Sequence, residues 1–426
     1  MMDLAMFSWA YASQRTIVEM IGLFWFLLVF DIPRYFLGFI CVFITSSTEQ
    51  KNRDDRAWTG KVSVLIAGYN EAESVERCIR SLRGQSYPNL EIICVDDGSL
   101  DGMYSILHRL ETEGVLDKAI RVNDRGGKSA ALNLASSVAS GEVFVVVDCD
   151  CTLDRDAVAQ LTRAFVDPDV GAVSGAVLVR NTSQSIMSSL QAIEYIFSIH
   201  LGRALVDYFG LVTCVSGALG AFRRNAWAAA GGMDVGPGED LDLTLKLRQR
   251  GFKIRFASDA LCWTTVPASL KGFLLQRRRW ERDAARLRFQ KFGFTFNPFD
   301  RRFRLIEALH QVEFLLYCIL AAVVFIAYAI WLSMNAPLLL PIVLIITTLL
   351  IILLDAVTLL LAAHTLKRYE YLGLLPFIPL FAPFQFVVMR NARLLAYLEE
   401  LLFATSQNDN FVPLKVRKCH QARNQR

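Results

Sequence analysis

The sequence has few of the residues that build metal centres or disulfide frameworks. Its 426 residues include only five histidines, which are scattered along the chain. The nine cysteines are an odd number and contain no Cys-x-x-Cys pair. Neither a structural zinc site nor a disulfide-stabilised fold is therefore indicated.

The chain also lacks a strong excess of one charge. It has 45 lysines and arginines against 41 aspartates and glutamates, which gives a net charge of +4. A nucleic-acid-binding domain is usually much more basic. We therefore expect no nucleic-acid partner, and we interpret the small positive balance as local attraction to membrane lipids.

Apolar residues, by contrast, are abundant. They make up 54% of the chain against 20% charged residues, and the mean hydropathy is +0.35. This balance excludes disorder and indicates membrane segments beside a globular domain. Met1–Ser13 carries one acid and no base, so the sequence predicts an uncleaved anchor and not a signal peptide.

Four apolar stretches are candidates for membrane segments. In the first, Asp31 and Pro33 limit the predicted span to Ile17–Phe30. The last holds three prolines, so it either spans or re-enters the membrane. Asp355 lies late in the third, either at the interface or lining a pore. The four stretches are Thr16–Thr45, Phe314–Ser333, Ala336–Leu354 and Tyr371–Met389.

Basic residues predict the orientation of these segments. They gather at 51–61, after the first span, and at 301–304, before the second, so the region between should be cytosolic. Arg390, Arg393 and the cluster at 415–418 also favour the cytosol. Four complete spans would place them outside, and the sequence leaves this conflict open.

Between the first two spans, short β-branched runs alternate with amphipathic runs. We expect strands at 62–66, 91–95, 119–122 and 143–147, with helices at 72–84, 104–113 and 128–139. This alternation predicts a Rossmann-like α/β domain with a mostly parallel sheet. Ligands of such sheets bind beyond the carboxyl ends of the strands.

Polar clusters follow three of these strands. They are Tyr69-Asn70-Glu71, Asp96-Asp97-Gly98-Ser99 and Asp148-Cys149-Asp150. Several carboxylates at one edge are costly unless a cation neutralises them, which favours Mg²⁺ or Mn²⁺ held together with phosphate oxygens. Alternatively, these acids form turns or cap helices.

The ordered series of motifs resembles family 2 glycosyltransferases of the GT-A fold over residues 61–285. Within the family, the pattern is most similar to membrane-embedded processive synthases of cellulose-like glucans, poly-N-acetylglucosamine, chitin oligomers and hyaluronan. Besides the three clusters above, the motifs are Gly126-Gly127-Lys128-Ser129 with Asn133, Ser216-Gly217-Ala218, Gly238-Glu239-Asp240 and Gln276-Arg277-Arg278-Arg279-Trp280.

The resemblance implies a role for each matching residue. Asp148 and Asp150 would hold Mg²⁺ or Mn²⁺, Asp240 would be the general base supported by Glu239, and Arg279 would stabilise the leaving group. The implied binding residues for the nucleotide sugar are Ala67, Tyr69, Glu71, Asp96, Asp97, Lys128, Asp148, Gln276 and Arg279, and those for the acceptor are Trp280, Glu194, Tyr195, Ser216 and Gly217.

Simpler roles stay open for several of these residues. Glu239 and Asp240 are also suited to cap a helix that starts near Leu241. Trp280 is also typical of an interfacial anchor, and Glu194 of an ordinary helix. Lys128 at a helix start is unfavourable without a nearby anion, which favours a phosphate.

The predicted organisation has five parts. An anchor covers residues 1–45, the cytosolic GT-A domain 46–270, basic interfacial helices with the Gln-x-x-Arg-Trp motif 271–305, a C-terminal transmembrane region 306–403 and a basic tail 404–426. The segment 276–304 carries ten basic residues against three acids, so we expect it to lie against anionic lipid.

The sequence thus predicts an integral protein of a bacterial plasma membrane with a cytosolic catalytic domain. It would transfer a hexose or N-acetylhexosamine from a UDP-sugar, with inversion, to a growing β-linked polysaccharide and export the chain, with an accessory subunit or a second copy as a further partner. The alternatives are single-step transfer to a polyprenyl phosphate or other lipid, and a catalytically silent membrane scaffold.

Overall fold

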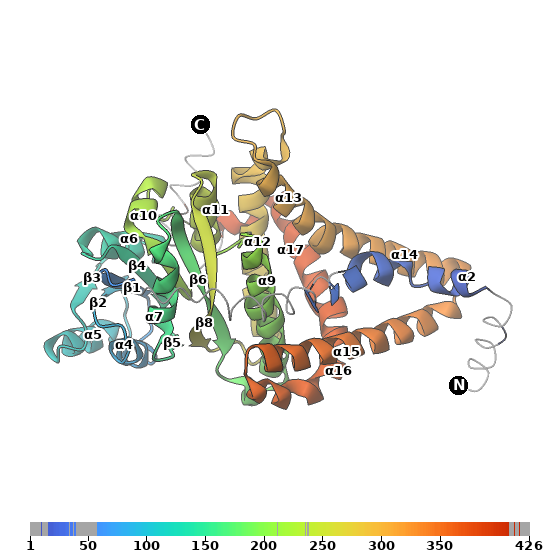
Figure 1. Cartoon of the computed structure of the whole chain (residues 1–426), viewed down its shortest axis with the longest axis horizontal. Helices are drawn as coiled ribbons and strands as arrows, with labels where there is room; N and C mark the ends of the chain where they lie inside the picture. Colours follow the sequence, from blue (N-terminus) through green and yellow to red (C-terminus); the bar gives the residue numbers. More distant parts are fainter. Residues whose placement is uncertain are drawn as a thin grey trace. The chain divides into compact units, whose positions relative to one another are not determined.

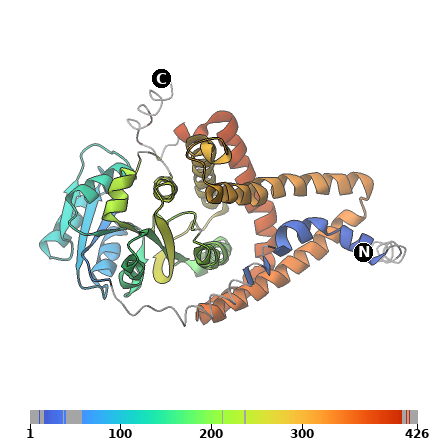
Figure 2. The same cartoon turned by 45° about the horizontal axis from the view of Figure 1, so that its top comes forward.

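The computed structural model describes residues 10, 16–33, 35–36, 38–39, 58–210, 212–234, 236, 238–408, 413 and 417 (Figures 1 and 2). The chain forms two compact units. We call residues 49–293 with 399–426 the sheet unit, and residues 1–48 with 294–398 the helical unit.

The first half of the sheet unit is the predicted parallel sheet. The central strands β1 and β4 are almost continuously apolar because both of their faces are buried, as in most parallel sheets. The register runs through β2, β1 and β4, so that Gly68 pairs with Asp96 and Ala67 with Asp148 at one edge. These strands are β1 (Val62–Gly68), β2 (Leu90–Asp96), β3 (Lys118–Arg121) and β4 (Val143–Asp148).

The second half adds strands of mixed direction, giving eight strands in the order β3-β2-β1-β4-β7-β6-β8-β5 among the described residues. β7 is antiparallel to both β4 and β6, whereas β6 and β8 are parallel with two irregularities. The strands are β5 (Thr152–Leu153), β6 (Val170–Val179), β7 (Leu219–Arg223) and β8 (Lys253–Thr264). The predicted fold class, a mostly parallel GT-A-like sheet with additional apolar helices, is confirmed.

Helices cover both faces of the sheet (Figure 1). One face packs its alternate residues, such as Val64 and Ile92, against α4 (Val75–Arg83), α5 (Met103–Thr112) and α7 (Ala157–Thr162). The other face carries α6 (Lys128–Val138) and α10 (Arg224–Ala230), where Trp227 contacts Phe144 edge to face at 5.7 Å. Both faces are therefore dry, and the open positions lie at the strand ends.

The sheet unit contains further helical segments. Those that approach the site are α8 (Ile186–Glu194), the π-helix η4 (Tyr195–Leu201), α9 (Gly202–Tyr208), α11 (Glu239–Gln249), α12 (Leu270–Ala285) and the π-helix η5 (Arg286–Lys291). The 3₁₀ segments are η2 (Arg163–Val166), η3 (Thr182–Gln184), η10 (Thr405–Asn408) and η6 (Gly293–Phe296), which begins at the boundary between the units.

The helical unit has three described helical stretches that are long and apolar enough to cross a membrane, as judged by length and composition. They are Leu305–Asn335, Leu339–Thr365 and Tyr369–Phe403. The first contains α13 (Leu305–Phe314), η7 (Leu315–Leu320) and α14 (Ala321–Asn335); the second is α15; the third contains η8 (Tyr369–Phe377), α16 (Ile378–Pro383), η9 (Phe384–Met389) and α17 (Arg390–Phe403).

The prolines of the last stretch change the helix type without ending the helix. Pro376 lies in the 3₁₀ segment η8, and Pro383 directly precedes the π-helical turn η9. Both helix types rearrange the backbone bonds that proline cannot make. The sequence correctly predicted an irregularity here, and the structure shows how the helix accommodates it.

The first apolar stretch is only partly described. It contains α2 (Ile17–Gly22) and η1 (Leu27–Asp31), separated by a turn at Leu23–Phe24. The turn coincides with a hydrogen bond from Tyr328 Oη to the Leu23 carbonyl, 2.6 Å long. Most of residues 34–45, the remainder of this apolar stretch, lie outside the described residues.

Asp355 lies in the interior of the helical unit. Its side chain is fully buried within α15, and Oδ1 accepts a hydrogen bond of 2.6 Å from Tyr35 Oη.

We expect Ile66→Ala to destabilise the sheet unit by about 2–5 kcal/mol, because Ile66 is fully buried between β2 and β4 and its loss leaves a cavity. Thermal unfolding of the purified full-length protein, followed by circular dichroism, measures the change. Leu134→Ala on α6, where Leu134 is exposed, is the matched control and should shift the midpoint far less. Equal midpoints for the two variants would contradict the assignment of β1 to the core.

Candidate active site

The end of β1 opens the site. Ala67, Gly68 and Tyr69 line a cavity at the carboxyl edge of the sheet. The next residue, Asn70, adopts the left-handed conformation with φ of 57°, which asparagine tolerates better than most residues. Its side-chain oxygen accepts from Leu100 N and its own N–H donates to Ser99 Oγ, each at 2.9 Å. The loops after β1 and β2 are therefore tied together.

Asp97, after β2, organises a glycine turn. Its two carboxylate oxygens accept hydrogen bonds of 2.7 Å from the backbone N–H groups of Gly126 and Gly127. Gly127 has φ of 90°, a conformation that favours glycine, and directly precedes α6. Asp97 thus fixes the turn from which Lys128 projects.

Lys128 joins two carboxylates that come from distant parts of the chain. Its Nζ lies 2.6 Å from Asp148 Oδ1 and 3.0 Å from Glu239 Oε1. Burial lowers the pKa of Lys128, but the charges of Asp148 and Glu239 outweigh it, and the net pKa lies well above the usual value. Lys128 is therefore a permanent cation at the start of a helix, where only nearby anions make it favourable.

Asp148 and Asp150 lie at the same rim of the cavity. Burial raises the pKa of Asp148 to about 6, and the charge of Asp150 adds to this against the opposing effect of Lys128. The Asp150 carboxylate accepts a hydrogen bond from Thr264 Oγ1 at 3.2 Å, and Cys151 Sγ lies 3.3 Å from its other oxygen. Two carboxylates thus share a poorly solvated position that favours a second cation.

This pair fits a divalent ion of the Mg²⁺ type. Among the described residues, no group of three or more histidine, cysteine, aspartate or glutamate side chains is arranged to hold a metal by itself. Mg²⁺ is commonly bound through one or two carboxylates, with substrate phosphates and water completing the shell. The donor set of Asp148 and Asp150 matches that pattern.

Asp240 lies in the first turn of α11 and lines the same cavity. Its oxygens accept from Leu241 N at 2.7 Å and from Gly217 N at 3.3 Å. Burial raises the pKa of Asp240, and the neighbouring charge of Glu239 adds to it. For Glu239, burial would raise the pKa, but Lys128 outweighs it and the pKa is lowered.

Helix α11 begins at Glu239, close to the predicted start near Leu241, and Gly238 is its N-cap. Glu239 and Asp240 therefore lie in the first turn and are not the cap residues, and Asp240 accepts a hydrogen bond from the adjacent Leu241 N–H. Its other oxygen faces the Gly217 backbone. Asp240 thus binds two backbone N–H groups and still lines the cavity.

Helix α12 closes one side of the cavity. Gln276, Arg279 and Trp280 line it together, as expected from their spacing of three and four residues on one helical face. The cavity has a volume of about 660 Å³. The predicted site residues that line it are Ala67, Tyr69, Asp97, Lys128, Asp148, Asp150, Tyr195, Ser216, Gly217, Glu239, Asp240, Gln276, Arg279 and Trp280.

Three predicted residues do not line this cavity. Glu71 accepts a hydrogen bond of 2.7 Å from Ser74 Oγ in front of α4, and burial raises its pKa. Asp96 is fully buried, and its Oδ1 accepts from Ser99 N at 2.9 Å. Glu194 is buried at the end of α8 and binds Arg277.

Several cations at the site escaped the sequence analysis. Arg125 stacks on the Tyr69 ring at 3.9 Å, and Arg203 and Arg288 also line the cavity. Arg125 directly precedes the glycine pair and was recognisable from that position. Arg203 and Arg288 have no motif around them, and only the fold brings them to the site.

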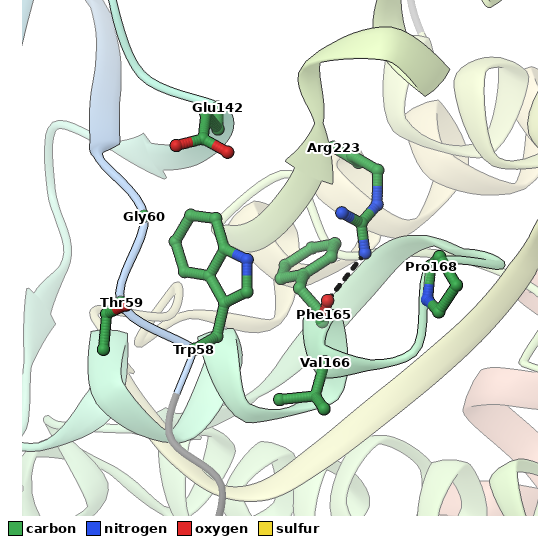
Figure 3. Close-up of a pocket in the computed structure, with 8 residues that line it drawn as sticks. All are labelled: Trp58, Thr59, Gly60, Glu142, Phe165, Val166, Pro168 and Arg223. Carbon is green, nitrogen blue, oxygen red and sulfur yellow. Dashed lines mark hydrogen bonds between the residues drawn. The ribbon is translucent and has the colours of Figure 1, made fainter.

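A second hollow lies at the opposite edge of the sheet (Figure 3). There Arg223 donates to the carbonyls of Phe165, Asp167 and Val170 at 2.8–3.0 Å. Trp58 stacks on Tyr87, whose Oη donates to the Gly60 carbonyl at 2.5 Å. These contacts fix the entry into β1, so we interpret the hollow as structural.

The sheet is of the mostly parallel, GT-A-like type, and an acidic cavity lies at the carboxyl ends of its parallel strands. A sequence model described as "Glycosyltransferase like family 2" matches residues 60–282, more than half of the chain. The chain therefore belongs to this family and is a glycosyltransferase.

Curated relatives are similar to the same region. The chain is 30% identical over 246 residues to the poly-β-1,6-N-acetyl-D-glucosamine synthase of Staphylococcus aureus strain COL, covering 57% of this chain and 59% of that protein. It is 31% identical over 236 residues to the synthase of the same name from Staphylococcus epidermidis, covering 55% and 57%. The chain thus matches less than two thirds of these relatives' length.

A solved structure extends the likeness in fold. A mannosyltransferase from Pyrobaculum calidifontis, in complex with GDP-Man and Mn²⁺, superimposes with a TM-score of 0.53 at 22% identity, covering 90% of this chain and 99% of that one. At this identity the likeness concerns the fold alone.

Asp97→Asn should weaken UDP binding about tenfold, because an amide supplies one acceptor in place of the two that hold Gly126 and Gly127, and the Lys128 turn loosens. Isothermal titration of UDP measures it. Asp101→Asn is the control, because Asp101 binds the backbone N–H groups of Ala72 and Met103 but does not line the cavity. Unchanged UDP affinity in Asp97→Asn would show that the turn does not depend on this carboxylate.

Proposed function

We propose that the protein is a processive, inverting synthase that transfers a hexose or N-acetylhexosamine from a UDP-sugar to a growing β-linked polysaccharide and feeds the product into its membrane segments. The observation that supports this most is one cavity lined by Asp148, Asp150, Lys128 and Asp240 and also by Gln276, Arg279 and Trp280 of α12. Groups suited to a diphosphate and groups suited to a sugar acceptor thus share one space.

In this proposal the rim of the cavity holds the donor. Tyr69 and Arg125 lie beside the nucleoside, Asp97 fixes the adjoining turn, and Lys128 and Arg279 meet the diphosphate. Asp148 and Asp150 would hold Mg²⁺ or Mn²⁺, which when bound neutralises charge on the departing diphosphate. Lys128, now shared by Asp148 and Glu239, would then be drawn towards the phosphates.

Asp240 is the proposed general base. An acceptor hydroxyl oxygen forms a bond to the anomeric carbon from the side opposite the diphosphate, while the bond from that carbon to the phosphate oxygen breaks. The hydroxyl proton passes to the Asp240 carboxylate, and the electron pair leaves with the diphosphate. A raised pKa suits this role, because it strengthens the base while burial excludes water.

Trp280 is the proposed platform for the acceptor. The residue remains 38% exposed although it belongs to the cavity wall, and an exposed indole is a favourable surface for a sugar ring. Ser216, Gly217 and Tyr195 complete the wall on the acceptor side. Holding the chain end next to Asp240 after each addition is what processive transfer requires.

A contact within the sheet unit supports a topology with residue 399 on the same side of the membrane as the sheet. Glu399 of α17 binds Arg278 of α12 at 2.6 Å, so the chain returns to the sheet unit after residue 398. An even number of complete crossings must then separate residues 294 and 399. In α17, Leu395, Leu398 and Leu402 are exposed on one face, which is typical of a helix lying along the membrane surface. We propose that the stretches Leu305–Asn335 and Leu339–Thr365 cross the membrane and that Tyr369–Phe403 does not.

The donor we propose to test first is UDP-N-acetylglucosamine, because the matching relatives are synthases of poly-β-1,6-N-acetyl-D-glucosamine. A panel that also contains UDP-glucose, UDP-galactose and GDP-mannose should be offered to the purified protein with Mg²⁺, with Mn²⁺ and with EDTA. We expect metal-dependent nucleotide release and a polymeric product. One lipid-linked sugar would support the single-step alternative, and no release from any donor would favour a silent scaffold.

Asp240→Asn should reduce turnover by more than about 100-fold while leaving UDP affinity within about twofold, because the amide keeps the shape but accepts no proton. Nucleotide release under saturating donor and UDP titration measure the two effects. Asp156→Asn is the control, because Asp156 is exposed on the same unit. Asp242 is not suitable, because it binds Lys246 and Lys291. Normal turnover in Asp240→Asn would remove this residue from the base role.

The pH profile should report the same carboxylate. Turnover needs ionised Asp240, so activity should fall towards acidic pH as this group is protonated. Since the Glu239 charge raises the pKa of Asp240, Glu239→Gln should lower that pKa and move the acidic limb of the profile to lower pH. The measurement is kcat/KM for the donor across pH. A shift to higher pH would contradict the assignment.

A further inference from the structure

Glu194 and Arg277 form a buried ion pair, a contact that the sequence motifs did not predict. Arg277 Nη1 lies 2.8 Å from Glu194 Oε1, and Nη2 donates to Oε2 at 2.8 Å. The two side chains meet as a planar fork, the strongest arrangement of arginine and carboxylate. The side chains are only 11% and 7% exposed, so water competes little with the pair.

The guanidinium of Arg277 also lies among three aromatic rings. Its central carbon is 4.5 Å from the Trp280 ring centroid, 5.2 Å from that of Phe273 and 5.7 Å from that of Tyr195. These distances are in the range of cation–π attraction. One face of the Trp280 indole is thus covered by a cation that Glu194 holds in place.

Helix geometry explains why this arrangement bears on the cavity. Arg277 and Trp280 are three residues apart in α12 and therefore lie on one face of the helix. Gln276, which directly precedes Arg277, and Trp280 both line the cavity. Glu194 ends α8, and Tyr195, which begins the π-helix η4, lines the cavity too. The fork therefore joins the two helical segments that form the acceptor wall.

We propose that Glu194 and Arg277 are positioning residues for the acceptor: the fork fixes the Trp280 ring with one face covered, so that its other face receives the terminal sugar beside Asp240. The inference rests on the proposed function of Trp280 and extends it. Glu194 acts through Arg277 and does not contact the sugar, which differs from the direct contact implied by the family resemblance.

A buried ion pair gains little net stability over apolar residues of similar volume, because removing both charges from water offsets their attraction. A pair kept for stability alone is thus replaceable by such residues. A pair kept to orient Trp280 is not, because methionine places no planar cation beneath the indole. The two roles therefore predict different behaviour for a double replacement.

The test uses the full-length protein in lipid nanodiscs with UDP-N-acetylglucosamine and a tetramer of β-1,6-linked N-acetylglucosamine as acceptor. Three variants are compared: Arg277→Lys, Glu194→Gln, and the double variant Glu194→Met with Arg277→Met. Donor KM and acceptor-independent UDP release report the donor site, and acceptor KM reports the acceptor wall. Thermal unfolding checks that each variant is folded.

We expect acceptor KM to rise about tenfold in Arg277→Lys and in the double variant, with donor KM and acceptor-independent UDP release within about twofold of the parent. Arg278→Lys is the matched control, because Arg278 lies next to Arg277 but is exposed and binds Glu399. It should leave acceptor KM unchanged.

Normal acceptor KM in the folded double variant would overturn the inference, and so would an equal loss of donor and acceptor steps. Glu194→Gln leaves the Arg277 charge buried, so this variant is used only if it folds. The double variant removes both charges and decides the test if Glu194→Gln does not fold. If the parent protein released no UDP from any donor, the proposed function itself would fail. If the parent were active and the variants behaved like it, only the inference about Glu194 and Arg277 would fail.

Discussion

The interaction on which the site depends is the contact of Lys128 with Asp148 and Glu239. It connects the end of β4, the start of α6 and the start of α11, which are far apart in the sequence. The fold brings four carboxylates, Asp148, Asp150, Glu239 and Asp240, to one cavity, and their mutual repulsion must be offset by cations. One lysine serves two of them, which leaves room for a metal ion and a diphosphate in the proposed reaction.

The parallel half of the sheet was predictable from local pattern. β1, β2 and β4 are short, apolar and bounded by polar turns, so their positions agree with the expected ranges to within two residues. The antiparallel half was not predictable. β6 is rich in small residues, β7 has five residues and β5 has two, and these strands pair with partners distant in sequence. Periodicity carries no information about such pairings.

The site shows the same division. Residues directly after strands or in compact motifs, such as Asp97, Asp148 and Gln276, were expected together and line one cavity. Glu194 and Arg277 are 83 residues apart and meet only because the fold brings the end of α8 close to α12. The sequence alone therefore could not show that Glu194 binds an arginine. It also could not show that Arg277 is buried while the adjacent Arg278 is exposed.

The most direct test of the account is electron paramagnetic resonance of Mn²⁺ titrated into the full-length protein with and without UDP. If Asp148 and Asp150 supply an incomplete shell that a diphosphate completes, one ion per chain should bind tightly only when UDP is present, and Asp150→Asn should abolish that binding. Equal Mn²⁺ binding in the parent and in Asp150→Asn, or no ion retained with UDP, would contradict the claim that this acidic rim holds a metal-bound nucleotide.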